Sequence, residues 1–259
     1  MLGDAVGMLA YIERVLARVG LGYRHAGFLL GCKACALEEN HRFQEAEFVG
    51  RSAVEREPSD AWGMHAVSHV HEMTGRAADG LAWIEGHPKA IWNCNNFRYH
   101  LLRHQALFQL DLGQPLLALD LYDRFIRADR TDDFRDIANA ASLLQRLELA
   151  GLDVGSRWGE LAELCARRIE DRTLVFADLH YVMALAGAGK MDAAQSLAQS
   201  LLTVPGQSGH QSRLAQRVGA SAAEAIIDHA SGRYSEAARK LLNVQALMPG
   251  IGGSHAQRD

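Results

Sequence analysis

Proline and cysteine are scarce in this chain of 259 residues, and each shortage excludes a class of protein. With only five prolines, long stretches are free to form uninterrupted helices. Four cysteines are too few for a disulfide framework in a chain of this length. Cys32 and Cys35 have the spacing of metal ligands, but no second pair of this kind accompanies them, so we interpret them as packed thiols.

An excess of positive charge and a long apolar run are also missing. The formal net charge of -4 offers no basic field for a phosphate backbone, so nucleic acid is not an expected partner. No apolar run approaches the roughly 20 residues that span a bilayer, and the first ten residues carry no basic segment typical of a signal peptide. We expect no membrane contact and a cytoplasmic protein with one domain over residues 1–259.

What the sequence does contain is a recurring helical pattern. Apolar residues recur at intervals of three and four rather than two, which predicts an all-α fold. Five segments share a turn, then an aromatic or apolar residue, then a small residue. The small residues are Ala46, Gly80, Ala118, Ala194 and Ala237. Such spacing predicts a tetratricopeptide-like helix-turn-helix array, an α-solenoid, of about six helical pairs.

Glycine has a physical role in this pattern. At turn positions 75, 113, 189 and 232 a glycine can end the first helix with a positive φ, and the small residue that follows lets the paired helices approach closely. A further pair without this turn form is expected over residues 136–169. Residues 203–211 are expected to form a linker loop, and residues 250–259 a flexible tail.

Two short stretches each place two histidines four residues apart: His65 with His69, and His100 with His104. On an α-helix this spacing puts both imidazoles on one face, and Glu72 falls on the same face as His65 and His69. Two neighbouring helices would then direct four histidines and a carboxylate into one space. Neutral imidazoles in such a set can bind zinc, iron or manganese. The four histidines are therefore the predicted metal ligands.

Other polar residues fall on the predicted first helices of the pairs, which usually line the concave face of a repeat array. We expect these residues to share one groove. The expected ligand-binding residues are His65, His100, Asn96, Arg146, Asp178 and Asn139. If the groove is catalytic, the expected acid–base residues are His69, His104, Glu72 and His180.

The turn pattern resembles the tetratricopeptide repeat, and several polar motifs in order resemble the tetratricopeptide repeat protein 38 family. These motifs are His65 to Arg76, Cys94-Asn-Asn96, His100 to His104, Ala140 to Glu148, and Asp178-Leu-His180. The resemblance covers roughly residues 31–202. It implies a helical-repeat fold and no settled activity. One position departs from the family pattern: Asn139 stands where an aspartate is expected before the Ala140-Ala-Ser-Leu-Leu run.

Three classes of function remain open at this point. We predict a helical-repeat protein that binds a small molecule or peptide in a concave, histidine-rich pocket. The alternative is an enzyme, a metal-dependent or histidine/acid hydrolase or oxidoreductase that uses the same pocket. A third is a protein-interaction scaffold whose polar groove is purely structural. An enzyme should close the groove into a pocket, whereas a peptide-binding groove should stay open along the array. An uncapped repeat end would also allow a homodimer.

Overall fold

The computed structural model describes residues 4–172, 174–203 and 209–258, and these residues form helices and no β-strand, which confirms the predicted all-α class. In chain order the α-helices are α1 (Ala5–Val19), α2 (Ala26–Glu39), α3 (Phe43–Arg56), α4 (Ala61–Met73), α5 (Ala77–Glu85), α6 (Pro88–Trp92), α7 (Phe97–Asp111), α8 (Pro115–Leu121), α9 (Phe134–Leu149), α10 (Arg157–Ala166), α11 (Val175–Gly187), α12 (Met191–Ser200), α13 (His210–Leu214), α14 (Ala220–Ala230), α15 (Tyr234–Val244) and α16 (His255–Arg258). Most of the predicted linker at 203–211 lies outside the described residues, and α13 begins at His210. None of the described helices is long and apolar enough to cross a membrane.

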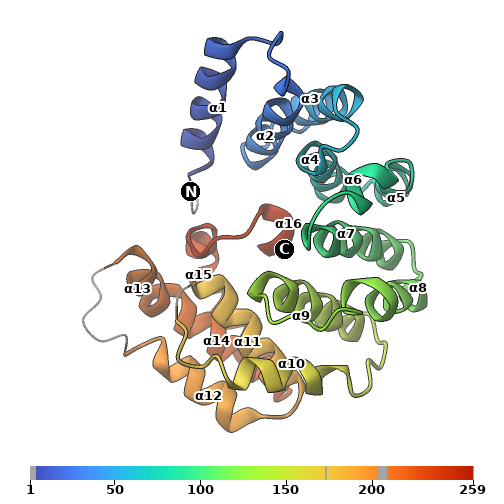
Figure 1. Cartoon of the computed structure of the whole chain (residues 1–259). Coiled ribbons are helices and arrows are strands. Elements are labelled where there is room, and N and C mark those ends of the chain that lie inside the picture. The colour runs from blue at the N-terminus through green and yellow to red at the C-terminus, as the bar shows by residue number, and fades with distance from the viewer. Residues whose placement is uncertain (1–3, 173, 204–208, 259) are drawn as a thin grey trace.

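The six predicted helix pairs are in contact among the described residues: α2 with α3, α4 with α5, α7 with α8, α9 with α10, α11 with α12, and α14 with α15. Neighbouring pairs are joined by further contacts, such as those of α3 with α4 and of α10 with α11. Figure 1 shows these pairs following one another along a curved path. One large apolar core runs through the pairs from Val54 to Ile251, and a smaller cluster attaches α1 to α2, α3 and α4. Because α4, α7, α9 and α11 are the first helices of their pairs, their polar residues can face a common interior.

The turns inside the pairs depend on a left-handed backbone. Four turn glycines have a positive φ between 67° and 76°: Gly75, Gly113, Gly189 and Gly232. The matching position in the α2–α3 turn is His41, whose φ of 59° is uncommon for a residue with a Cβ. The small residue that follows the turn is buried in each of the five segments. At Gly80, for example, a Cβ would lie 2.4 Å from the ring of Phe108. The positive φ predicted for the turn glycines is confirmed, whereas the close approach at Gly80 is to α7 of the next pair and not to α4, its partner in the pair.

The C-terminal segment turns back into the space that the helix pairs surround. After α15 the chain forms a 3₁₀ turn over Gln245–Ile251 and then α16, which contacts α4. Figure 1 shows α16 at the centre of the curve, beside α4 and α7. The tail predicted to be flexible over residues 250–259 instead contains the end of the 3₁₀ turn and α16, while position 259 lies outside the described residues. Ile251 and Ala256 are buried there, an apolar contact that the glycine-rich composition did not reveal.

Candidate metal centre

Helices α4 and α7 bring four histidines together. His65 and His69 lie one turn apart on α4, and His100 and His104 lie one turn apart on α7. The α4 helix begins at a local cap, because the Asp60 carboxylate accepts a hydrogen bond from the Trp62 amide. All four imidazoles are buried, and one nitrogen from each lies within 4.8 Å of the others. The two pairs that the sequence placed on separate helices therefore meet in one cluster.

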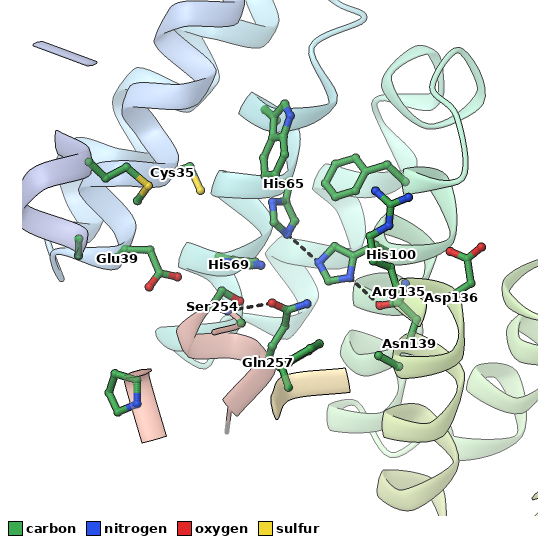
Figure 2. Close-up of a pocket in the computed structure, with 18 of the residues that line it drawn as sticks. Cys35, Glu39, His65, His69, His100, Arg135, Asp136, Asn139, Ser254 and Gln257 are labelled. Atoms are coloured by element: carbon green, nitrogen blue, oxygen red, sulfur yellow. Dashed lines mark hydrogen bonds between the residues drawn. The ribbon is translucent and has the colours of Figure 1, made fainter. Parts of the chain in front are cut away.

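The inner nitrogens of the cluster face one another. The Nε2 of His100 lies 2.8 Å from the Nε2 of His65 and 3.2 Å from the Nε2 of His104. The Nε2 of His69 is buried and has no hydrogen-bond partner among the described residues. Figure 2 shows the His65 and His100 rings directed toward each other across the space between α4 and α7. The Nε2 atoms therefore form the centre of the cluster.

The outer nitrogens are held by oxygen acceptors from three different helices. The Nδ1 of His104 lies 2.6 Å from Glu72 Oε2, and the Nδ1 of His100 lies 2.8 Å from Asn139 Oδ1. The Nδ1 of His69 lies 3.3 Å from Glu38 Oε2. An oxygen acceptor requires Nδ1 to carry the proton, so the Nε2 of each neutral ring presents a lone pair. The lone pairs of His100 and His104 thus point into one buried space, and that of His69 joins them when its ring is neutral.

Burial also determines the charge of these rings. It lowers the pKa of His65, His100 and His104 well below the usual value of 6.5, and the neighbouring histidines lower it further. At His69, burial would lower the pKa, but the hydrogen bond and charge of Glu38 outweigh it and raise the pKa overall. At least three of the rings are therefore neutral at pH 7, which is the form that binds a metal ion.

A partly open cavity of about 380 Å³ adjoins the cluster and is lined by His65, His69 and His100. Its walls come from α1, α2, α4, α7, α9, α11 and the C-terminal segment. Figure 2 shows Cys35 and Glu39 on one side of this cavity, Arg135 and Asp136 on the other, and Gln257 between them. The cavity gives the histidine centre an approach from outside.

The structure brings most of the predicted site residues to this place. Asn139 and Glu72 contact the cluster as its outer acceptors. Asn96 lines the cavity, and its Nδ2 donates to Asp136. Glu72 and Asn139 were predicted from their places on the first helices of two pairs, and Asn96 from the Cys94-Asn-Asn96 motif; each lies on the expected helix or at its start.

Three predicted residues lie elsewhere. Arg146 and His180 line a second cavity, and Asp178 faces a much smaller one beside Arg172. The side chains of Phe176 and Gln257 line both large cavities, so the space inside the curve is divided between them. The continuous groove expected from a repeat array is thus two separate cavities in the described part of the chain.

Sequence analysis missed Glu38, the acceptor for His69. It lies at the end of α2 and is fully buried, and its contact with α4 joins positions 31 residues apart. The indication in the sequence was its position as a carboxylate at the end of a mostly apolar stretch.

The two cysteines of α2 were interpreted as packed thiols. This interpretation is wrong for Cys32, which is exposed, and only partly correct for Cys35, which is half-buried and borders the cavity. Burial and the charges of Glu38 and Glu39 raise the Cys35 pKa strongly, so its thiol stays protonated.

No protein-family model matches the chain. The histidine centre has two properties that bear on function: the direction of its Nε2 lone pairs and the negative charge of the carboxylates that contact two of its Nδ1 atoms.

Proposed function

We propose that this chain is a tetratricopeptide-like repeat protein, related to the tetratricopeptide repeat protein 38 family, that binds a divalent transition metal and presents it to a small molecule. The metal ligands are the Nε2 atoms of His65, His69, His100 and His104. The observation that carries the proposal is the set of oxygen acceptors on three Nδ1 atoms, which directs neutral nitrogens into one buried space. The six helix pairs and the turn glycines support the repeat architecture.

The distances in the cluster suit a coordinated ion. A metal–imidazole bond of about 2.0–2.1 Å places neighbouring ligand nitrogens about 3.0–3.4 Å apart. The two Nε2 pairs of 2.8 and 3.2 Å already lie close to this separation. Small rotations of the histidine side chains would complete the shell. Without a cation, neutral His65 can donate its Nε2 proton to His100, but the Nε2 atoms of His100 and His104 remain two acceptors 3.2 Å apart, an arrangement that a bound cation would relieve.

The charges around the cluster also suit a divalent ion. Four neutral imidazoles leave the double positive charge of the ion uncompensated. The carboxylates of Glu38 and Glu72 contact the outer nitrogens and supply two negative charges. Carboxylates in this position orient the ligand ring and increase its basicity. An all-imidazole set favours zinc, iron, copper or nickel, whereas manganese prefers oxygen ligands.

The adjoining cavity favours a metal-dependent enzyme as the second candidate. Three of the four ligands line that cavity, so one side of the ion would face a bound molecule. Such an ion can polarise a carbonyl or activate a water, which supports hydrolase or oxidoreductase chemistry. Two carboxylates, those of Glu39 and Asp136, line the same cavity as these histidines. The peptide groove, the homodimer and the cytoplasmic location stay predictions.

Metal analysis tests the proposal. The untagged protein should contain about one transition-metal ion per chain after growth with zinc or iron, and the His69→Ala and His104→Ala variants should lose it. The control is His210→Ala, because His210 is exposed and outside the cluster. It should retain the metal. A metal-free wild-type protein under both supplements, or full metal retention in the two cluster variants, would leave the purely structural groove as the better explanation.

A further inference from the structure

A second large cavity lies inside the curve, apart from the histidine cluster. Its volume is about 340 Å³, within the range of small-molecule sites. Helices α9, α11, α14 and α15 and the C-terminal segment line it, whereas the four clustered histidines do not. No carboxylate is among the described residues that line it. The chemistry of this cavity therefore differs from that of the metal centre.

One face of α11 presents a hydrogen-bond acceptor to this cavity. Phe176, His180 and Met183 follow one another at intervals of four and three residues along that helix, and all three line the cavity. The Nδ1 of His180 lies 2.7 Å from the backbone oxygen of Phe176, so it donates its proton to that oxygen. Burial lowers the His180 pKa to about 4. The ring is therefore neutral at pH 7, and its Nε2 carries a lone pair.

The Nε2 of His180 is an acceptor without a donor. The residue is 8% exposed, and no group in the described part of the chain donates a hydrogen bond to this nitrogen. A buried acceptor of this kind is stabilised by a group that brings a proton to it. Because His180 lines the cavity, a molecule bound there can supply that group.

A hydroxyl donor lies near this acceptor. Ser142 of α9 lines the cavity, and its Oγ accepts a hydrogen bond of 2.8 Å from the Nη2 of Arg103. Since the oxygen already accepts this bond, the hydroxyl proton can be donated to a molecule in the cavity. Arg103 lies behind the cavity wall, but, besides burial, its charge also lowers the pKa of His180, which indicates that Ser142 and His180 are close to the same guanidinium. One acceptor and one donor together match a hydroxyl group, which can donate one hydrogen bond and accept another.

The rest of the lining is mostly apolar and favours an aromatic ring beside that hydroxyl. The centre of the Phe176 ring lies 4.5 Å from that of His180, so a group bound to His180 would also contact an aromatic side chain. Met183 and Met248 line the same space, and thioethers contact aromatic rings favourably. Leu149 lines the cavity and is 66% exposed, which leaves apolar surface for a substituent on the ring.

Charged head groups fit this lining less well than a neutral hydroxyl. A carboxylate offers no proton, so it would place a second acceptor against the His180 Nε2. An ammonium would find no carboxylate among the described lining residues. Arg146 also lines the cavity, but it already interacts within the protein, so it is assigned no part in binding.

We infer that this cavity binds a neutral phenol with a short apolar substituent. The phenol hydroxyl donates to the His180 Nε2 and accepts from the Ser142 hydroxyl, and the ring contacts Phe176. The substituent lies along Met183 and Met248. The inference does not rest on the metal proposal, since none of the four clustered histidines lines this cavity.

Calorimetric titration of the full chain with 4-propylphenol tests this site. The phenol should bind at least about tenfold more tightly than 4-propylanisole, which has the same ring and substituent but no hydroxyl proton. It should also bind more tightly than 4-propylbenzoate, which is an anion at neutral pH. In protein carrying ¹³C-methyl methionine, the phenol should shift the methyl resonances of Met183 and Met248, which are assigned with the variants Met183→Leu and Met248→Leu.

The variant His180→Leu examines the acceptor. Leucine has no acceptor atom, so the phenol should lose about tenfold or more in affinity while the anisole keeps its affinity. The matched control, His210→Leu, changes an exposed histidine outside the cavity and should leave both affinities unchanged.

Two results with the wild-type protein would overturn the inference, even if His180→Leu fails to fold. One is a phenol that does not bind or binds no more tightly than the anisole. The other is phenol binding that leaves both methionine methyls unshifted. The metal proposal is tested by metal content and would stand after either result.

Discussion

Glu72→Gln isolates the electrostatic part of the metal proposal. Glutamine keeps an oxygen that can accept from His104 Nδ1, which lies 2.6 Å from the Glu72 carboxylate, but it removes the negative charge. Since His104 remains in its orientation, the four ligand nitrogens should stay in place. The variant therefore changes the charge around the ion without deleting a ligand.

The expected loss of metal affinity in Glu72→Gln follows from the distance between the carboxylate and the ion. A carboxylate separated from the ion by one imidazole ring is about 6 Å away, and at an effective dielectric constant of about 20 it stabilises a divalent ion by about 5 kcal/mol as an upper limit. Exposure of part of the Glu72 side chain to solvent reduces this value. Substitution of such outer groups commonly costs 10–100-fold in metal affinity, or about 1.4–2.7 kcal/mol. We expect Glu72→Gln to lower the metal affinity within that range.

Asn139→Asp is the matched change in the opposite direction. It keeps the oxygen that lies 2.8 Å from His100 Nδ1 and adds a charge. It should raise metal affinity, and it restores the aspartate that the family resemblance leads one to expect. Both affinities are measured by competition with a chromophoric chelator at constant pH and salt. If both variants bind metal within twofold of the wild type, the carboxylates do not tune an ion and the argument from charge fails.

Three further outcomes are expected. The metal-loaded protein should keep its ion at pH 6.5 and release it only at clearly lower pH, because burial lowers the pKa of His65, His100 and His104 and so weakens the competition from protons; chelator absorbance measures that release. Burial raises the Asp178 pKa from 3.8 to about 7, so the folded state loses stability as the pH rises from about 4 to 7. Asp178→Asn should recover up to about 4 kcal/mol at pH 8 and little at pH 4, measured by denaturant unfolding; an equal effect at both pH values would contradict this origin. Gly80→Ala should cost about 1–3 kcal/mol because its Cβ would strike Phe108, while Gly159→Ala, with open space around it, should not destabilise the protein in thermal unfolding.

Local pattern was enough to predict several features of the fold. The intervals of three and four between apolar residues predicted helices because one face of each helix has to be buried. The turn glycines were predictable because few other residues adopt a positive φ at little cost, and the structure has that φ at Gly75 and Gly113. The spacing of His65 with His69 and of His100 with His104 predicted two shared faces in the same way.

Only the tertiary structure determined which of those helix faces contact one another. The contact of Glu38 with His69 depends on how α2 packs against α4. The C-terminal segment, folded back inside the curve, leaves Arg146 in a cavity separate from the histidines. Helix periodicity is set by the backbone geometry of neighbouring residues, so the sequence determines it directly. The division of the interior depends on the packing of side chains far apart in the chain, which no local pattern encodes.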